Sequence, residues 1–523
     1  MRRPGESPER RGAQRRVAPE SHLFRDLIRQ SARDPAHRRS HLADSRHTCS
    51  YPDIPRRLEA IQRFLTERSV RPEDCVTAEI SNSLPSALTV LALLDGGYSV
   101  LLLPAADEGA SVRDNELPAP AFSQWRLTVR HEEGAKSTVL DDPSGFLSVR
   151  PNPRFRAAAV SVEGGSPRIY GRTSGSLGVA KLAVHSYGRV RDNARCALQR
   201  LRLDPSCRIA LPSPIFHLYA LRVAFLPGVA AGASIDFQQR ANLLSYFERE
   251  AEFDPNVAFV TPTFCETLLR ARKAPRPYRF IVIGGDRLGE HTRTASERLH
   301  GPLINAYGST EMGLISLGDL AMPPELRAGT VGYPLPGIVT RLVPAAEVER
   351  DEESACELQL RSPYAFRGYV DLDGVPLAAA SAVDGDWFRT HDLAREGPEG
   401  TLQILGRSDL SVNRNGRLLP FADLESQLRG IDDVVDAAVV AGPEDIRGRL
   451  LVAFCVVRAR TSVSPQVLRT RCASRLPAFA VPDKIVIVAD LPKLPNGKVD
   501  RRALAMLALD TAATRAATPE TSA

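Results

Sequence analysis

The chain has 523 residues, of which 43% are hydrophobic and 25% are charged, and its formal net charge at pH 7 is +6. These values are typical of a soluble globular protein with room for more than one domain. No apolar run is long enough to span a membrane, and the N-terminal arginines precede no apolar core that would make a secretory signal. We therefore expect a cytoplasmic protein.

Residues 1–20 form an arginine-rich leader. Its six arginines and three glutamates supply +3 of the net charge. Such a segment can bind nucleic acid or an anionic membrane, but a disordered leader is the simpler interpretation. The rest of the chain is nearly balanced in charge, which argues against a nucleic-acid partner.

Eight cysteines are spread along the chain, and none pairs with another at the spacing of zinc ligands. A protein of this size does not need disulfides. We therefore expect free thiols in a reducing cytosol.

Residues before about 330 have the pattern of an α/β fold. An apolar strand at 75–80, a helical stretch at 85–94 and a strand at 99–103 form a β–α–β unit, which implies parallel pairing. Helical stretches such as 263–272 separate further short strands, which are expected at 209–211, 257–260, 280–283 and 303–306. The predicted fold class is α/β, with helices covering largely parallel sheets.

Two changes of pattern follow. From Thr330 onward, short strands and turns predict a β-rich subdomain. After Gly406 a new unit begins, and residues 410–508 are expected to form a small α+β domain. Its expected elements are strands at 434–441 and 450–457 and helices at 420–428 and 465–475. Residues 509–523 are rich in Ala and Thr and are expected to be disordered.

The segment from Thr173 to Lys181 has the sequence TSGSLGVAK. Its small residues allow a tight turn with inward-pointing N–H groups, its two serines add hydroxyl donors, and Lys181 adds a positive charge. This is the chemistry of a phosphate-binding loop. It is not a Walker A loop, because the glycine spacing differs and no Ser or Thr follows the lysine.

Four further segments follow in a fixed order. They are Asn305–Glu311 (NAYGSTE), Trp387–Leu393 (WFRTHDL), Gly406–Asp409 (GRSD) and Pro495–Arg501 (PNGKVDR). Together with the loop, they resemble the adenylate-forming superfamily of acyl-CoA synthetases, aryl-acid ligases, luciferases and adenylation domains of nonribosomal peptide synthetases. The resemblance runs from residue 21 to residue 508. It implies a large N-terminal AMP-binding domain at 21–405, a hinge at 406–409 and a mobile C-terminal domain at 410–508.

The resemblance also implies an ATP- and Mg²⁺-dependent activation of a carboxylic acid, with a role for each segment. The loop would hold the β- and γ-phosphates of ATP. Its implied contacts are Thr173, Ser174, Gly175, Ser176, Gly178 and Lys181. Leu177 stands where the family commonly has Thr, which removes one hydroxyl donor, and Ala180 stands where Pro is common.

For the nucleoside and the metal, the resemblance implies that Tyr307 stacks on adenine, Thr310 contacts the α-phosphate and Glu311 binds Mg²⁺ through oxygen. Other implied nucleotide contacts are Gly284, Gly285, Asp286, Asn305, Ala306, Gly308 and Ser309. Asp392 would accept hydrogen bonds from the ribose hydroxyls, and Arg407 would reach the ribose or a phosphate. His391 occupies a position that is usually Gly.

Lys498 is the implied catalytic lysine, which would bridge the attacking carboxylate and the α-phosphate. Only six of the 68 basic residues are lysines, yet lysine stands at both positions where the family uses one, Lys181 and Lys498. Arginine does not readily replace a slim, flexible point charge. This pattern favours a functional role for both.

The second half-reaction is implied by Asp409, which matches the family's hinge, and by Gly416. A rotation about Asp409 would bring Gly416 to the active site, where a glycine leaves room for the pantetheine arm of CoA or of a carrier protein. The family usually shows a Lys-x-Arg-Gly-like run here, and this chain has NRNG at 413–416.

The segment Pro214–Leu221 resembles the part of acyl-CoA and coumarate-type ligases that gates the acid. The implied substrate contacts are His217, Leu218, Gly308 and Leu314. No acidic residue follows this segment before Asp236, and a buried ammonium without a partner would be costly. We therefore expect a fatty or aryl acid without a free α-amino group.

Three functions remain open. The first is a ligase that makes an acyl-adenylate and transfers the acyl group to CoA or to a carrier protein. The second is a freestanding amino-acid adenylation protein of nonribosomal peptide synthesis. The third is a degenerate nucleotide-binding protein without turnover, for which Leu177 and His391 would be the evidence. No carrier or condensation domain is visible, so we expect the acceptor to be a separate molecule.

Overall fold

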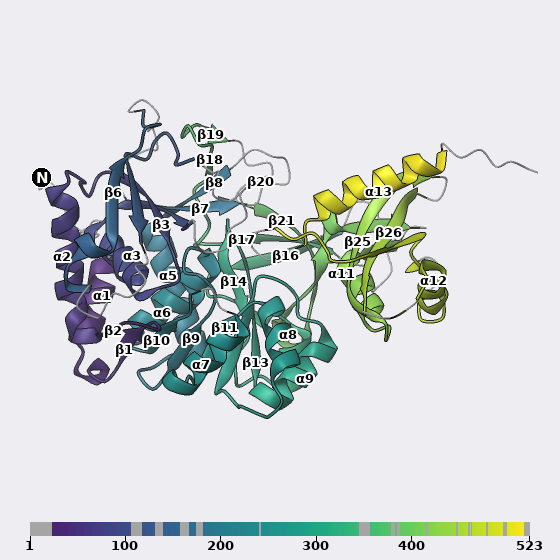
Figure 1. The fold of residues 1–523 in the computed structure, drawn as a ribbon, viewed down its shortest axis with the longest axis horizontal. Coiled ribbons are helices and arrows are strands. Elements are labelled where there is room, and N and C mark those ends of the chain that lie inside the picture. The colour runs from purple at the N-terminus through teal and green to yellow at the C-terminus, as the bar shows by residue number, and fades with distance from the viewer. Residues whose placement is uncertain are drawn as a thin grey trace, which may run out of the picture.

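A computed structural model describes most of the chain as a large N-terminal domain with a small C-terminal domain beside it (Figure 1). The described residues are 23–105, 118–130, 140–156, 167–173, 181–239, 242–344, 356–377, 382–383, 387–414, 417–445, 448–458, 461, 463–476, 480–494 and 499–516. The arginine-rich leader at 1–20 lies outside this part.

A nine-stranded sheet forms one half of the large domain, in the order β15-β14-β13-β12-β11-β9-β10-β1-β2. The strands from β13 to β1 run parallel, and the edges are antiparallel. The bounds are β1 His41–Ala43, β2 Thr48–Ser50, β9 Arg208–Leu211, β10 Ser234–Phe237, β11 Val257–Val260, β12 Phe280–Gly284, β13 Leu303–Ser309, β14 Gly313–Leu317 and β15 Tyr333–Pro334. The four strands predicted here are confirmed, and so are their parallel pairings.

An eight-stranded sheet forms the other half, in the order β19-β18-β8-β7-β4-β3-β5-β6. The bounds are β3 Cys75–Ile80, β4 Ser99–Pro104, β5 Trp125–Val129, β6 Leu147–Pro151, β7 Arg168–Thr173, β8 Lys181–Ser186, β18 Tyr369–Val370 and β19 Pro376–Leu377. Strands β3 and β4 pair in parallel around helix α3, which confirms the predicted β–α–β unit. Helix α3 (Leu84–Gly96) is largely apolar on every face, as expected for a helix in which nearly every residue is buried.

Helices pack on both sheets of the large domain. They are α1 Leu23–Arg33, α2 Ile54–Glu67, α5 Tyr187–Leu201, α6 Leu226–Ala230, α7 Leu243–Phe253, α8 Pro262–Ala271, α9 Glu290–His300 and α10 Pro324–Gly329, with a π-helix, η7, at Ala220–Phe225. One continuous core joins the two sheets, with Val76 on one and Val257 on the other. Within the described residues, no helix combines the length and apolar character needed to cross a bilayer.

The predicted β-rich subdomain is a five-stranded antiparallel sheet. Its bounds are β16 Val339–Pro344, β17 Cys356–Arg361, β20 Ala382–Val383, β21 Trp387–Glu396 and β22 Leu402–Arg407. One hairpin from this region, β18–β19, joins the eight-stranded sheet instead, where Tyr369 of β18 pairs with Ala183 of β8. This exchange brings the two sheets together beside the site described below.

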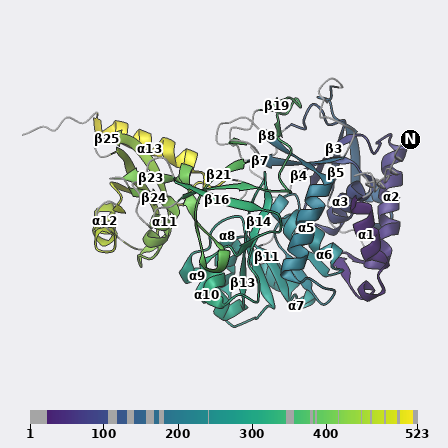
Figure 2. The same cartoon turned by 180° about the vertical axis from the view of Figure 1, so that it is seen from behind.

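The C-terminal domain has its own hydrophobic core, and both views place it next to the five-stranded sheet (Figure 1, Figure 2). Its bounds are β23 Ser411–Arg414, β24 Arg417–Pro420, α11 Phe421–Arg429, β25 Val434–Asp445, β26 Gly448–Val457, α12 Pro465–Ala473, β27 Lys484–Val488 and α13 Arg501–Ala516. Because α13 continues to Ala516, the prediction of disorder from residue 509 is wrong for residues 509–516. Residues 517–523 lie outside the described part.

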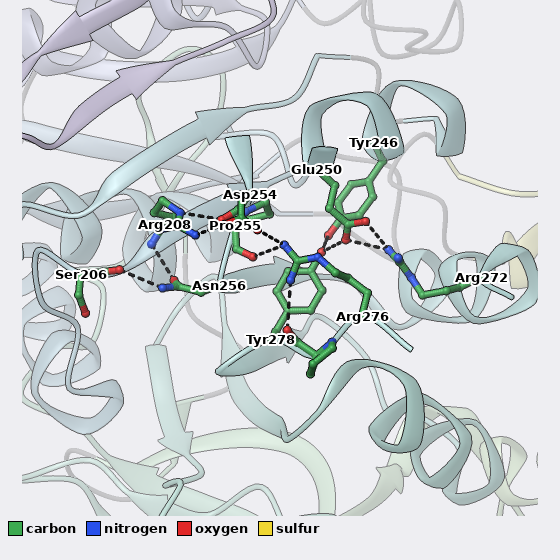
Figure 3. Close-up of polar contacts among 11 residues, drawn as sticks. Ser206, Arg208, Tyr246, Glu250, Asp254, Pro255, Asn256, Arg272, Arg276 and Tyr278 are labelled. Atoms are coloured by element: carbon green, nitrogen blue, oxygen red, sulfur yellow. Dashed lines mark hydrogen bonds and ion pairs between the residues drawn. The ribbon is translucent and has the colours of Figure 1, made fainter. Parts of the chain in front are cut away.

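A buried polar cluster fixes the helices that flank β11 and β12 (Figure 3). The carboxylate of Glu250 on α7 accepts hydrogen bonds from Arg272 at 2.7 and 2.8 Å. It also accepts one from the Tyr278 hydroxyl, which lies 2.8 Å from the Tyr246 hydroxyl. Burial and the Glu250 carboxylate raise the pKa of Tyr278 far above its ordinary value. These contacts join α7 to the segments that follow α8 and precede β12.

All eight cysteines lie in the described part, and each is a free thiol. Seven are buried. Burial raises the pKa of several of these thiols, including Cys75 and Cys455, both to about 12. They are therefore protonated at neutral pH.

Candidate active site

The NAYGSTE segment lies where the three sheets of the large domain meet. It occupies the end of β13 and the turn into β14. Asn305 is anchored there, because its side chain donates a 2.7 Å hydrogen bond to the carbonyl of Thr330. Gly308 passes so close to the backbone of Gly313 that a Cβ atom would collide with its carbonyl oxygen. The bulge between Tyr307 and Gly308 thus turns the following residues toward the neighbouring sheets.

On one side of this segment, Tyr307 contacts the five-stranded sheet. Its hydroxyl donates a hydrogen bond to Oδ2 of Asp392 on β21. Burial, and then the Asp392 charge, raise the pKa of Tyr307 well above its ordinary value. Arg407 of β22 lies across from Asp392, with its Nη1 3.5 Å from Oδ1. The structure therefore brings together three residues that the sequence assigned to the nucleoside.

His391 adopts the left-handed backbone conformation, with φ +61°. Only glycine takes this conformation without strain, which explains why glycine is usual at this position. The imidazole Nδ1 lies 3.5 Å from Oε1 of the buried Glu357, which also accepts a 2.7 Å hydrogen bond from Arg389. These contacts hold the turn and leave Asp392 in place.

The turn after β12 supplies the other predicted nucleoside residues. Gly284 is buried against the ring of Tyr219, whose hydroxyl donates a 3.0 Å hydrogen bond to the carbonyl of Val282. Gly285 and Asp286 are exposed, and Asp286 accepts a 2.8 Å hydrogen bond from the backbone of Arg287. Because β12 and β13 are parallel neighbours, this turn lies at the same sheet edge as Ala306 and Tyr307.

On the other side of the segment, Glu311 contacts the eight-stranded sheet. Its Oε1 accepts a 2.7 Å hydrogen bond from the hydroxyl of Tyr369 on β18. Nζ of Lys181, the first residue of β8, lies 5.8 Å from the centre of the Tyr369 ring. A carboxylate and a lysine thus share one aromatic neighbour. Glu311 fits a magnesium ligand, because carboxylate oxygen suits this hard cation and the second oxygen does not take the Tyr369 bond.

The predicted phosphate loop connects β7 and β8. Thr173 and Lys181, its two ends, are cross-strand neighbours, and the Thr173 hydroxyl donates a 3.3 Å hydrogen bond to the carbonyl of Lys181. The residues between them, which include Ser174, Gly175, Ser176 and Gly178, lie outside the described part. Their phosphate contacts stay predictions.

Residues predicted to contact the acid lie near Thr310. Leu218 and Thr310 both pack against Gly171. A Cβ atom added to this glycine would lie 2.5 Å from Cδ1 of Leu218 and 3.1 Å from Cγ2 of Thr310, so the side chains of Leu218 and Thr310 are neighbours. Leu314 is buried, and its backbone N–H and C=O both bond to the side chain of Asn193 at 2.9 Å. His217 is exposed and packs against Phe216, with ring centres 4.5 Å apart.

The predicted residues of the C-terminal domain are only partly described. Lys498 and Gly416 lie outside the described residues. The ends of the Lys498 segment are held together by a bridge between Lys493 and Val499. The segment leads into α13, whose first turn lies toward the large domain (Figure 1). Asp409 is the middle residue of a short 3₁₀ helix, η9 (Ser408–Leu410), between β22 and β23.

Sequence reasoning missed Tyr369. It is 58 residues from Glu311 in the chain, and its position depends on the pairing of β18 with β8. No local pattern around Tyr369 signals that pairing. The contact also explains why Glu311 is only partly exposed.

Replacing Glu311 by glutamine is expected to reduce adenylation and to make it dependent on excess Mg²⁺, because the amide keeps the shape but loses the charge. Tyr369→Phe removes only the hydrogen bond that orients the carboxylate and should cost about 10-fold. ATP–pyrophosphate exchange measured across a Mg²⁺ series checks both. The exposed Glu325 provides a matched control in Glu325→Gln. A Glu311→Gln variant whose loss is the same at every Mg²⁺ concentration would contradict the metal role.

Comparisons with known proteins identify the family. The family model described as AMP-binding enzyme matches residues 27–370, and the AMP-binding enzyme C-terminal domain matches residues 423–498. Triostin synthetase I of Streptomyces triostinicus is 28% identical over 510 residues, which cover 93% of this chain and 94% of that protein. Oxalate–CoA ligase of Arabidopsis thaliana is 24% identical over 477 residues, which cover 85% of this chain and 90% of that protein.

Among solved structures, ATP-bound MatB from Rhodopseudomonas palustris has the same fold. The TM-score is 0.76 at 21% identity, with 94% of this chain and 99% of that chain covered. The family models together span both domains of the present structure. The chain therefore belongs to the AMP-binding enzymes of the adenylate-forming superfamily and is an AMP-forming acid–thiol ligase.

Proposed function

We propose that this enzyme uses ATP and Mg²⁺ to convert a fatty or aryl acid into an acyl-adenylate. It then transfers the acyl group to the thiol of CoA or of a phosphopantetheine carrier protein. The observation that carries the proposal is the meeting of Lys181, Tyr369 and Glu311 beside Thr310. A magnesium triphosphate would need both a cation and a carboxylate, and this arrangement offers one of each.

Each half of the nucleotide has supporting residues. Asp392 and Tyr307 would hold the ribose and adenine, with Arg407 beside them, and the mutual contact of these side chains supports this assignment. Thr310 and Lys498 would meet the charge that develops at the α-phosphate, which is the largest contribution in reactions of this kind. A degenerate, inactive protein is disfavoured, because the His391 substitution is accommodated while Asp392 keeps its contact with Tyr307; Leu177, the other substitution that suggested it, lies outside the described residues.

The acid would carry no free α-amino group. Asp236, the first acidic residue after the pocket segment, is buried on β10, and its Oδ1 accepts a 3.1 Å hydrogen bond from Nε of Arg249. It therefore has a partner and cannot serve an ammonium group. The charge on Arg222, which is buried in η7 just after the pocket segment, is positive and would repel one. These two observations disfavour the alternative, a freestanding amino-acid adenylation protein.

The acceptor is proposed as CoA or a carrier thiol, since one relative is named for CoA and another for the synthesis of triostin. The eight free thiols support a reducing cytosol as the place of action.

ATP–pyrophosphate exchange with matched acids tests the proposal. 3-Phenylpropanoate and phenylalanine differ only by the ammonium group, and we expect the former to be preferred by about 10- to 100-fold, the cost of one unsatisfied buried group. Pooled fatty and aryl acids then identify the substrate, and adding CoA or a pantetheinylated carrier identifies the acceptor. Exchange that only a proteinogenic amino acid supports would overturn the assignment.

A further inference from the structure

The largest fully buried side chain in the described part of the chain is Arg222, which is 2% exposed. Its guanidinium nitrogens Nε, Nη1 and Nη2 form no hydrogen bond with any described residue. Buried charges in proteins are normally paired, because removal of an ion from water is costly. Arg222 is therefore a charge that the described fold buries without a counterpart.

Loss of the proton does not resolve this cost. Burial lowers the pKa of Arg222 to about 9, and no carboxylate among the described residues acts on it. At neutral pH the guanidinium is still a cation with five hydrogen-bond donors. A bound molecule that carries a hydrogen-bond acceptor would satisfy these donors.

Arg222 lies next to the residues assigned to the acid. It belongs to the π-helix η7, one turn after Leu218, and π-helical turns are frequent at functional sites. The guanidinium packs against Gly313, in the turn between Glu311 and Leu314. A Cβ atom added to this glycine would lie only 2.6 Å from Nη1 of Arg222. Gly313 also has φ +71°, and this turn admits the arginine because glycine occupies it.

A second buried polar side chain lies beside the same turn. His185 of β8 is fully buried, and its ring lies close to the backbone of Thr310. Burial, and then the charge of Arg222, lower its pKa well below the ordinary value, while the nearby backbone of Thr310 acts in the opposite direction. The imidazole is therefore neutral. Arg222 and a buried imidazole from a different element thus lie beside the turn that follows Thr310, next to residues assigned to the acid.

We propose that Arg222 is a specificity-determining residue that binds a second electron-rich group on the tail of the acid. His185 supports it from β8. The substrate class is then a carboxylic acid whose far end carries a hydrogen-bond acceptor, a second carboxylate above all, or a phenolic oxygen or ring nitrogen. This inference depends on the proposed function, because it concerns the tail of the same acid.

Matched acids test the inference by ATP–pyrophosphate exchange. Benzoate is compared with 3-hydroxybenzoate, pyridine-3-carboxylate and benzene-1,3-dicarboxylate, and hexanoate with hexanedioate. We expect the wild type to prefer the acceptor-bearing member of at least one series in kcat/KM. Arg222→Met should lower kcat/KM for that acid by about 10- to 100-fold, the usual contribution of a hydrogen bond to a charged group, and should lower kcat/KM for the plain acid much less. Arg222→Lys keeps the charge and should retain part of the preference.

The control for a general effect on folding is Arg327→Met. Arg327 is also buried, at 7% exposure, but its Nη1 donates a 3.1 Å hydrogen bond to the carbonyl of Met322. That variant should leave the ratio between the two kinds of acid unchanged. An equal loss for both kinds in Arg222→Met would overturn the inference, because it would place Arg222 on the reacting carboxylate or in a structural role. A wild-type preference for plain acids would overturn it too, while the proposed function would stand.

Thermal unfolding without acid supplies a readout that does not need turnover. Removing an unpaired buried charge should raise the Tm in Arg222→Met, whereas Arg327→Met should lower it. If no acid supports exchange, the proposed function fails. The Tm values alone then decide whether the Arg222 guanidinium is unpaired in the fold. A lower Tm for Arg222→Met than for the wild type would show that the guanidinium has partners in the fold and would overturn the inference.

Discussion

Replacing Lys498 by alanine is expected to lower the rate of adenylate formation by about 10²–10³, the usual effect of removing one preorganised group from a developing charge. The fold and the affinity for ATP should change little. Lys498 lies in a short segment whose described ends are already joined by the Lys493–Val499 bridge, so its side chain is not needed to close the segment. The lost interaction is with oxygens that carry extra charge only in the transition state, and kcat falls more than KM rises.

ATP–pyrophosphate exchange measures this loss, and supply of the preformed acyl-adenylate separates it from the second half-reaction. Thioester formation from that adenylate should proceed at a nearly normal rate in Lys498→Ala. Lys493→Ala is the matched control, because Lys493 is exposed and lies on the same segment. Near-normal exchange in purified Lys498→Ala, or an equal loss in Lys493→Ala, would reject the catalytic assignment.

The sheets of the large domain were predictable because their strands are buried on both faces. Such strands are continuous apolar runs bounded by turns, and Val257–Val260 and Cys75–Ile80 have the predicted bounds. Parallel pairing followed from the helices between them. The order of the strands did not follow, because pairing partners such as β18 and β8 are far apart in the sequence.

The same limit applies to the site. Asn305–Glu311 and Asp392 were found from local motifs, and the structure brings them together through Tyr307. Tyr369 was not found, because its contact with Glu311 depends on a hairpin that leaves one sheet for another. Roles that depend on Ser174–Ala180, Gly416 and Lys498 stay predictions, since these residues lie outside the described part.

Composition misled the prediction in two places. The Ala- and Thr-rich segment after residue 508 was assigned to disorder, yet α13 runs to Ala516, as the high helix propensity of alanine allows. The role of Arg222 could not be predicted from the sequence, because arginine makes up nearly all of the 68 basic residues. Only its burial without a partner, which is a property of the folded chain, distinguishes it from the others.

Replacing Asp409 by proline is expected to separate the two half-reactions. Adenylation and thioester formation need different groups at one place, first Lys498 and then the segment around Gly416. One small domain can present both only by rotating about a short pivot that absorbs a large backbone change. Asp409 is the middle residue of the short η9 helix between the last strand of the large domain and the first hairpin of the small one. Its neighbour Ser408 is tied to the large domain by a 3.1 Å hydrogen bond to the carbonyl of His391.

Proline fixes φ near −65° and removes the N–H group, so it restricts the pivot without removing a catalytic group. We expect Asp409→Pro to retain ATP–pyrophosphate exchange and to lose thioester formation with CoA or carrier. Asp409→Ala, which keeps the N–H and a freely variable φ, should retain both activities and serves as the control. If exchange and thioester formation fall together in the proline variant while its Tm is normal, the pivot lies at another residue. If thioester formation is unaffected, the two activities do not require a rotation at this position.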